Sequence, residues 1–227
     1  MLVMKLSLIV PTLNAGGRVA DTLHAWQTAI GPDEIIVSDG GSRDGTIPAA
    51  EAVGATVING PAGRGRQLAT GGNHAGGDWL LFMHADTLPG INAGPAARAF
   101  INDETNASNA AAFRLRLDDD SGQARRVERL ANWRAQKLGL PYGDQGLLIS
   151  RDAYKSLGGF RPMPLMEDVD LVRRIGRGRV TLLNGEVMTS ATRYRRDGYW
   201  KRPIKNVTLL CLYFLGVSSE RLARMYG

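Results

Sequence analysis

A run of five apolar residues, Trp79 to Met83, constrains the fold of this chain more than any other stretch. It follows a Gly-Gly-Asp turn, and its continuous apolar character predicts a strand that is buried on both faces. The run ends abruptly at His84 and Asp86, whose side chains, two residues apart on a strand, would point to the same side. In an open α/β sheet, ligands bind beyond the carboxyl ends of the strands, so Asp86 is a candidate binding residue.

These residues alone leave two interpretations open. Either Asp86 caps the next turn and His84 is a polar strand end, or both residues belong to a binding site. A hard divalent cation on a phosphate-bearing ligand needs only one or two protein carboxylates, because phosphate oxygens and water complete its coordination. Asp86 could supply that carboxylate, so the choice depends on the rest of the chain.

The chain before this strand alternates strands with helices. We predict strands at residues 6–10, 34–38 and 55–58, separated by helices at 19–30 and 47–53. Such alternation is typical of right-handed crossovers in a parallel sheet. We therefore predict an α/β fold with a Rossmann-like, mostly parallel sheet flanked by helices.

The composition is that of an ordinary soluble globular protein, with 44% hydrophobic and 22% charged residues among 227. The single cysteine, Cys211, excludes an internal disulfide and any multi-cysteine metal site. The apolar run at residues 6–10 is too short for a signal peptide core, and no later stretch reaches membrane-spanning length. We therefore expect a cytoplasmic location.

The chain carries a net charge of +6. A basic balance suits nucleic acid, anionic lipid or phosphorylated small molecules as partners. The sequence contains neither an RNA-binding aromatic signature nor zinc-ligand spacing. We therefore expect no nucleic acid partner.

A glycine-rich segment at residues 60–67 contains Arg64 and Arg66 and precedes a helix that we predict to reach Ala75. Amide groups at a helix start with arginines beside them can bind an anion such as phosphate. A flexible turn whose arginines face water is the alternative.

Two acids, Glu167 and Asp168, stand where a later helix begins. Acids are favoured at helix starts because they cap free amides and compensate the helix dipole. The functional interpretation is a general base held near a reacting hydroxyl.

Four segments in this order resemble family 2 glycosyltransferases of the GT-A fold. They are residues 9–14 (IVPTLN), 39–46 (DGGSRDGT), 84–87 (HADT) and 167–168 (ED). Residues 142–146 (YGDQG) and 215–224 further resemble a compact bacterial subgroup of largely unassigned substrate. The resemblance implies an inverting transfer of a sugar from a nucleotide-diphospho-sugar, UDP- or GDP-linked, to an acceptor hydroxyl, assisted by Mg²⁺ or Mn²⁺.

The resemblance also assigns roles. Asp168 would be the general base and Glu167 would orient the loop or touch a sugar hydroxyl. Asp86 would bind the metal, as the single carboxylate of a motif that usually has two, because His84 replaces the first. The residues implied at the nucleotide-sugar are Pro11, Thr12, Asn14, Asp39, Gly41, Ser42, Arg64, Arg66, His84, Asp86, Asp144 and Gln145.

We expect one domain over residues 1–227, with a nucleotide-binding half (1–86), an acceptor half (87–200) and a C-terminal helical segment (201–227). The apolar stretch at 204–217 has two interpretations. It packs on the domain or in a homodimer, or it contacts a membrane peripherally, at its inner face. In the second case a basic flank would meet anionic lipid headgroups: Arg193, Arg195, Arg196, Lys201, Arg202 and Lys205.

Two other functions remain as alternatives. A sugar nucleotidyltransferase would normally show a glycine-rich loop with a lysine directly after the first strand, which residues 11–18 lack. A non-catalytic nucleotide-sugar binding protein is the other, favoured by His84 in the metal motif.

Overall fold

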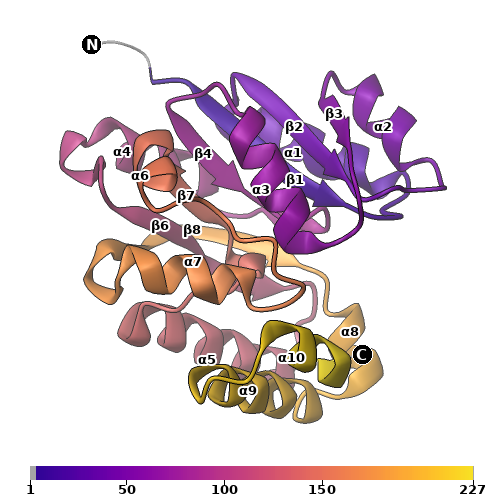
Figure 1. Ribbon diagram of the computed structural model, residues 1–227, viewed down its shortest axis with the longest axis vertical. Helices are drawn as coiled ribbons and strands as arrows, with labels where there is room; N and C mark the ends of the chain where they lie inside the picture. Colours follow the sequence, from indigo (N-terminus) through magenta and orange to yellow (C-terminus); the bar gives the residue numbers. More distant parts are fainter. Residues whose placement is uncertain (1–3, 227) are drawn as a thin grey trace.

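One mixed eight-stranded sheet forms the centre of the molecule within residues 4–226, the part of the chain that this computed structural model describes (Figure 1). The strand order is β3-β2-β1-β4-β7-β6-β8-β5. The first four strands in this order are parallel: β3 (Thr56–Asn59), β2 (Glu34–Asp39), β1 (Leu6–Thr12) and β4 (Trp79–Phe82). The strands predicted in this half are confirmed, with ends shifted by at most two residues.

The other half of the sheet departs from the predicted parallel arrangement. β7 runs antiparallel to both of its neighbours, β4 and β6, whereas β6 and β8 are parallel and β5 is antiparallel to β8. Their bounds are β5 (Thr87–Pro89), β6 (Ala110–Leu117), β7 (Leu147–Ser150) and β8 (Val180–Thr189). The predicted α/β class is therefore confirmed, but the parallel geometry belongs mainly to the N-terminal half.

Helices cover both faces of the sheet. Alternate residues of β1 face opposite ways: Leu8 and Val10 belong to one apolar cluster and Ile9 to the other. The first cluster includes residues of α1 (Arg18–Ile30), α2 (Thr46–Ala52) and α4 (Ala93–Asn102). The second includes residues of α3 (Arg64–His74), α6 (Arg151–Ser156) and α7 (Glu167–Ile175). The core thus consists of two layers, one on each side of the strands.

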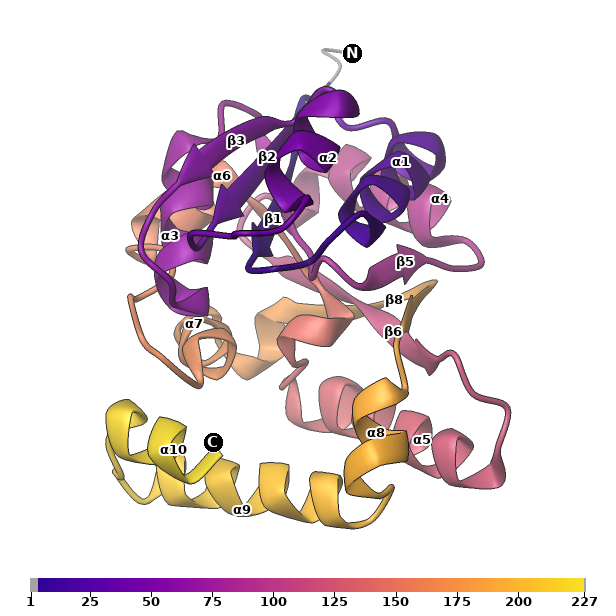
Figure 2. The same ribbon diagram turned by 90° about the vertical axis from the view of Figure 1, so that its right-hand side faces the viewer.

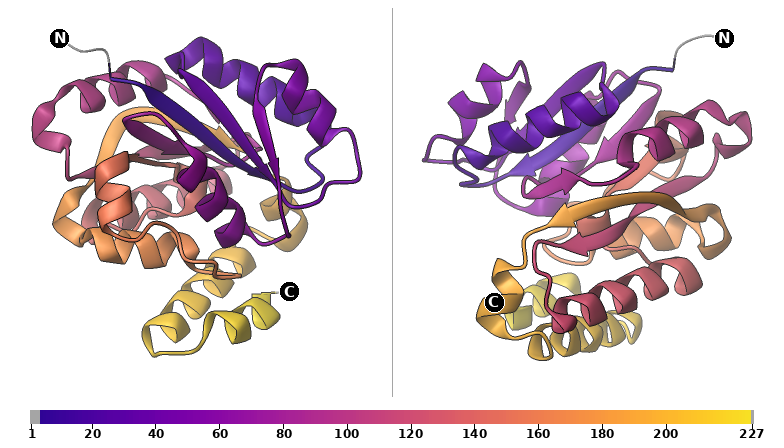
Figure 3. Two further views of the ribbon diagram at one scale, coloured as in Figure 1. Left: turned by 45° about the horizontal axis from the view of Figure 1, so that its top comes forward. Right: turned by 180° about the vertical axis from the view of Figure 1, so that it is seen from behind.

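Four further helices gather at the end of the molecule away from the N-terminus (Figures 2 and 3). They are α5 (Gly122–Leu138), α8 (Thr192–Asp197), α9 (Lys201–Phe214) and α10 (Ser219–Tyr226). Single turns of 3-10 helix lie at η1 (Glu104–Asn106), η2 (Gly143–Gln145) and η3 (Arg177–Arg179). No helix in the described part of the chain is long and apolar enough to span a membrane. The predicted C-terminal helical segment is confirmed, and the proposed division into halves stays a prediction.

A separate apolar cluster attaches these C-terminal helices to the domain. Leu209 of α9 and Leu222 of α10 are buried against Met166 and Val169 at the start of α7. Because α7 begins beside the ends of the central strands, this packing brings α9 and α10 to the same edge of the sheet.

Candidate active site

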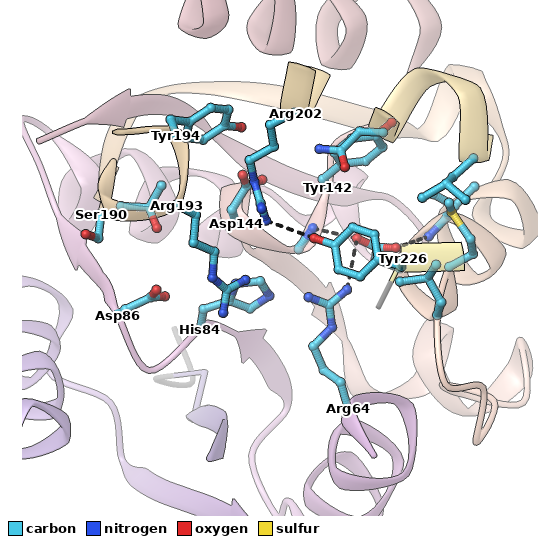
Figure 4. A pocket seen from close by; sticks show the side chains of 18 residues that line it. Arg64, His84, Asp86, Tyr142, Asp144, Ser190, Arg193, Tyr194, Arg202 and Tyr226 are labelled. Carbon is cyan, nitrogen blue, oxygen red and sulfur yellow. Dashed lines mark hydrogen bonds and ion pairs between the residues drawn. The ribbon is translucent and has the colours of Figure 1, made fainter. Parts of the chain in front are cut away.

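A cavity of about 130 Å³ lies at that edge (Figure 4). Its walls come from the segment after β4, the η2 turn, the start of α7 and the C-terminal helices. The side chains that matter for its chemistry are Arg64, His84, Asp86, Asp144, Asp168 and Arg193, together with Arg202 and Tyr226. Segments more than 100 residues apart in the sequence therefore meet at one site.

His84 and Asp86 both line this cavity, as predicted, although the local structure differs from the prediction. β4 ends at Phe82, and after one further ladder bond, from Met83 N–H to the Ile9 carbonyl (2.9 Å), the chain enters a turn. Ala85 faces away, toward the core, and its carbonyl accepts a hydrogen bond from the Thr22 hydroxyl (2.9 Å). The two polar side chains thus share one side because of the turn rather than because of a continuing strand.

His84 is held in its neutral form. Burial, together with the nearby charges of Arg64 and Arg193, lowers the pKa of its imidazole to about 3. The backbone of Gly143 packs directly on the ring, so that a Cβ added there would lie only 2.7 Å from Nε2. His84 can therefore accept a hydrogen bond or ligate a metal at neutral pH, but it cannot supply positive charge.

Asp168 lines the cavity, although it is not the N-cap residue of its helix. Its Oδ2 accepts a hydrogen bond from the Gly143 N–H (2.8 Å) and lies 3.9 Å from Nη2 of Arg64. The N-cap of α7 is Met166, with φ of 65°, and no side chain caps it. Its Oδ1 also accepts a hydrogen bond from the Val169 N–H (2.8 Å) in the first turn of α7. Asp168 therefore serves the helix start, as the capping interpretation predicts, and also presents its carboxylate at the cavity wall.

Glu167 has a different environment from its neighbour. Its side chain is only 1% exposed and forms an ion pair with Nε of Arg64. Burial raises the pKa of Glu167, while the Arg64 charge opposes that rise. Glu167 lines a second, apolar cavity behind the first and does not reach the main one, so its geometry supports positioning Arg64 rather than touching a sugar.

Asp144 and Gln145 were both predicted to contact a sugar, and the structure separates them. Asp144 lines the cavity, and its buried Oδ1 has no hydrogen-bond partner among the described residues. Burial raises the pKa of Asp144, although the charge of Arg134 counteracts this. An acceptor oxygen left free at a cavity wall suits a hydroxyl donor from a ligand.

Gln145 is fully buried and cannot contact a sugar. Its Nε2 donates to the Phe113 carbonyl (3.1 Å), and its Oε1 accepts from Nη2 of Arg134 (3.1 Å). The prediction for Gln145 is wrong because its amide is used to hold the η2 turn against β6.

The predicted nucleotide-binding residues lie on the neighbouring part of the same sheet edge. Asp39 is completely buried, and its two oxygens accept four hydrogen bonds: from the hydroxyls of Thr12 (2.8 Å) and Ser42 (2.5 Å) and from the amides of Gly41 (2.9 Å) and Ser42 (2.6 Å). Burial raises the pKa of Asp39, but these hydrogen bonds together hold it below its usual value. Asp39 therefore orders this loop through its hydrogen bonds, and its predicted contact with the nucleotide stays a prediction.

The loops after β1 and β2 are joined to each other. Asn14 N–H donates to the Ser42 hydroxyl (2.8 Å), and Arg43 N–H donates to Oδ1 of Asn14 (3.0 Å). Pro11, at the end of β1, is partly exposed at this edge. These residues do not line the main cavity, and neither does the exposed Arg66, although Arg64 does.

The sequence interpretation missed several cavity residues in the C-terminal part. Arg193 and Arg202 were assigned only to a lipid-binding flank, and Tyr142, Tyr194 and Tyr226 to no site. In the structure, Nη2 of Arg202 donates to the Tyr226 hydroxyl (2.9 Å) at the cavity wall. The signal that could have found Arg193 is its place just after the carboxyl end of β8, the same rule that selected Asp86.

The donor set of the cavity fits a divalent cation that is shared with a ligand. The described residues contain no group of three His, Cys, Asp or Glu side chains that could hold a metal alone. Asp86, however, is an exposed carboxylate at the cavity wall beside a neutral imidazole, and it forms no ion pair within residues 4–226. One carboxylate is sufficient when phosphate oxygens complete the coordination.

Comparison with known proteins agrees with this arrangement. Residues 7–158, more than half of the chain, match the family model described as glycosyl transferase family 2. A stretch of 48 residues is 50% identical to the O-antigen chain rhamnosyltransferase RfbN of Salmonella typhimurium (strain LT2), but it spans only 21% of this chain and 15% of that relative.

Several solved structures share the fold. The mannosyltransferase PcManGT from Pyrobaculum calidifontis, in complex with GDP-Man and Mn²⁺, has a TM-score of 0.65 at 20% identity, over 82% of this chain and 56% of its own. Glucosyl-3-phosphoglycerate synthase from Mycobacterium tuberculosis, with Mn²⁺, UDP and glucosyl-3-phosphoglycerate, has a TM-score of 0.59 at 22% identity, over 82% and 70%. S. aureus TarS 1-349 with UDP has a TM-score of 0.66 at 18% identity, over 82% and 60%. Because its family model covers most of the sheet and the segment that carries His84 and Asp86, the chain belongs to glycosyl transferase family 2.

Proposed function

We propose that this protein is an inverting glycosyltransferase that moves a sugar from a UDP- or GDP-linked donor to an acceptor hydroxyl. The observation that carries the proposal is the position of Asp168, whose carboxylate lies in the same cavity as Asp86. One site then contains a candidate general base, Asp168, and a candidate ligand, Asp86, for a cation bound to the donor's diphosphate. Similar proteins solved with UDP or GDP-Man together with Mn²⁺ support the donor class.

The donor's diphosphate belongs at the side of the cavity where Asp86, His84 and Arg193 meet. Asp86, with the neutral imidazole of His84 beside it, would hold Mg²⁺ or Mn²⁺. When bound, the cation would neutralise the charge that builds up on the departing nucleoside diphosphate. Arg64 and Arg193 add fixed positive charge to the same cavity, and such preorganised charges stabilise a developing anion without reorganising.

Asp168 would take the proton of the attacking hydroxyl. As the acceptor oxygen forms a bond to the anomeric carbon, the bond from that carbon to the diphosphate oxygen breaks, and the electron pair leaves with the diphosphate. Attack from the face opposite the leaving group inverts the anomeric configuration. One carboxylate base is sufficient because the leaving group departs as a stabilised anion and needs no general acid.

The Gly143 amide sets the orientation of the proposed base. Its hydrogen bond to Oδ2 fixes one oxygen of Asp168, and Arg64 approaches the same oxygen. Asp144, one residue further along, would accept a hydrogen bond from a sugar hydroxyl through its free Oδ1. The short η2 turn therefore serves both the base and the sugar.

A thermal-shift screen of UDP- and GDP-sugars, with Mn²⁺ and with EDTA, tests the donor and metal assignments. A ligand at a hundredfold excess over its dissociation constant stabilises the folded protein by about 2.7 kcal/mol, which a melting curve resolves readily. We expect stabilisation by one donor class that EDTA abolishes. Equal stabilisation by the donor with and without EDTA would show that donor binding does not require a divalent cation.

Product analysis then separates the remaining functions. Sugar transfer or slow donor hydrolysis that releases nucleoside diphosphate supports the proposal. Release of pyrophosphate from a nucleoside triphosphate would indicate a nucleotidyltransferase, and binding without turnover would indicate a non-catalytic binding protein.

A further inference from the structure

Helix α9 exposes an apolar stripe to solvent. Trp200 just before the helix, Ile204 and Val207 are 60%, 61% and 55% exposed, and Phe214 is 47% exposed. Their spacing of four, three and seven residues places them on one face of a helix. The opposite face packs on the protein through Leu209. An amphipathic helix normally buries its apolar stripe against the protein. The solvent-exposed stripe of α9 therefore requires a separate explanation.

Helix α5 extends the stripe into a surface. Leu130 and Trp133 are 58% and 55% exposed, and an apolar cavity lies between α5 and the first turns of α9. The guanidinium of Arg126 stacks 5.3 Å from the Trp200 ring and joins the two helices. We define the α5–α9 surface by its exposed apolar residues: Leu130, Trp133, Trp200, Ile204, Val207 and Phe214.

The charges on α5 and α9 are mainly positive. The acids of the turn before α5, Asp118, Asp119 and the exposed Asp120, are each ion-paired with Arg195 or Arg125. α9 carries three cations and no acid, and the only acid of α5, Glu128, is buried and bonded to Arg125. On the neighbouring helices, Asp197 of α8 is paired with Arg196 and Arg202, and Glu220 of α10 is exposed. The exposed cations on the two helices are Arg126, Arg129, Lys137, Lys201 and Lys205.

These charges distinguish between two possible partners of the α5–α9 surface, a second copy of the chain and a membrane. In a two-fold symmetric dimer the same patch meets itself, so the cations of one copy would face those of the other. An anionic lipid surface offers opposite charge together with an apolar interior. Tryptophan at the headgroup level and lysine or arginine around an apolar stripe are the features of helices that lie in a membrane interface.

We propose that the α5–α9 surface binds peripherally to an anionic membrane, with α9 lying in the plane of the headgroups. The exposed apolar side chains and the cations of α5 and α9 support this binding, which does not depend on the proposed reaction. The inward side of α9 carries Arg202, Asn206 and Leu209, which line the candidate active site. The site would then lie roughly one helix diameter, about 10 Å, from the lipid surface.

Vesicle flotation of the full chain tests the inference. We expect the protein to float with vesicles of phosphatidylcholine and phosphatidylglycerol, and to remain unbound with phosphatidylcholine alone or at high salt, because salt screens the charge attraction. Failure to float with the anionic vesicles at low salt would overturn the proposal.

Two variants and a matched control assign the binding to this surface. Ile204→Asp should weaken binding by at least roughly tenfold, because it removes an exposed aliphatic side chain that would enter the bilayer and adds an anion. Lys201→Gln should weaken it about fivefold, the contribution of one cation near an anionic surface. Ile91→Asp is the control: Ile91 is 72% exposed, precedes α4 and lies outside the α5–α9 surface. Equal loss in the control and in Ile204→Asp would contradict the assignment.

Tryptophan fluorescence gives an independent readout. Trp26 and Trp79 are buried, whereas Trp133 and Trp200 are exposed, so a change on adding vesicles reports the two on this surface. We expect the emission to shift to shorter wavelength and acrylamide quenching to fall, with a smaller shift in Trp200→Phe. A concentration-dependent dimer that Ile204→Asp dissociates, with no emission shift on adding vesicles, would instead make this face a protein interface and overturn the proposal.

Discussion

Asp168 and Glu167 are adjacent in the sequence, yet the structure gives them different environments. Asp168 faces the cavity and accepts from the Gly143 amide, whereas Glu167 is buried against Arg64. Both side chains carry a carboxylate. Their different burial and hydrogen-bond partners make Asp168 the candidate base and Glu167 a positioning residue.

Replacing Asp168 by Asn tests the base directly. The amide keeps the shape of the side chain but cannot take a proton, so turnover should fall by about 10²–10⁴-fold, the usual contribution of general base catalysis. The dissociation constant for the donor should change little, since the base acts on the acceptor. Initial rates and donor titrations on the same preparation measure both quantities. Near-normal turnover in a correctly folded Asp168→Asn protein would exclude this residue as the base.

Asp39 contributes to the stability of the fold as well as to the candidate nucleotide site. Asp39→Ala leaves the Thr12 and Ser42 hydroxyls and two amides without their acceptor, and unsatisfied buried donors cost about 1–3 kcal/mol. We expect urea denaturation to show a loss of stability in this range, together with weaker nucleotide binding. Unchanged stability with weaker binding would show that Asp39 acts through direct contact with the nucleotide rather than through the loop.

At the scale of elements, the η2 turn and the β4–β5 turn are packed against each other. Gly143 is required there because of close approach, since a Cβ would lie 2.7 Å from Nε2 of His84 and 3.5 Å from Oδ2 of Asp168. The turn that orients the proposed base is therefore positioned by the imidazole of His84.

Gly143→Ala should displace this contact and lower turnover by roughly tenfold or more, because a misplacement of about 1 Å can cost 10²-fold in rate. The melting temperature should fall only modestly. Adding His84→Ala to Gly143→Ala removes the clashing ring, so the double variant should be more stable than the sum of the two single effects predicts. Strict additivity in a double-mutant cycle would show that the two residues are not coupled.

The sequence predicted the N-terminal strands well because each is a short, mainly apolar run bounded by turn residues. β1, β2 and β4 are buried on both faces, whereas β3 is a partly exposed edge strand. It did not predict β8, where Asn184 and Gly185 interrupt the apolar pattern and exposed and buried residues are mixed. The register between β6 and β8 shifts near Ala112, so regular alternation is lost in the structure as well. Without β8, the position of Arg193 could not be inferred.

The same reasoning explains which site residues could be predicted. Asp86 and Asp168 follow from strand ends and motif order. Gln145 could not be judged, because a buried amide that holds a turn and an amide that binds a sugar look identical in a sequence. Asp39 was correctly placed at the strand end, but its hydrogen bond from Thr12 could not be predicted, because the two residues are 27 apart in the sequence.

At the scale of the whole molecule, the C-terminal helices form a unit with its own small core. Leu222 of α10 packs with Leu209 and with Met166, apart from the two clusters that flank the sheet. Such a satellite core allows α9 and α10 to detach without unfolding the sheet.

Leu222→Ala should destabilise this attachment by about 2–5 kcal/mol, the usual range for a buried leucine. Hydrogen exchange should accelerate mainly in α9 and α10, while amides of β1 and β4 keep their protection. Binding of ligands to the cavity should weaken, since Arg202 and Tyr226 belong to this unit. Uniformly faster exchange throughout the protein would show that the helices and the sheet unfold together.

The antiparallel pairing of β4 with β7 has a consequence for synthesis on the ribosome. β4 takes one neighbour, β1, from the chain already made, but its other neighbour begins at Leu147, roughly 65 residues after Phe82. At about 5–20 residues per second, the apolar edge of β4 stays unpaired for about 3–13 s while the next residues are added. During that interval the nascent chain carries an open strand edge at the centre of its future sheet, so chaperone binding or rapid translation of residues 83–150 would protect it from aggregation.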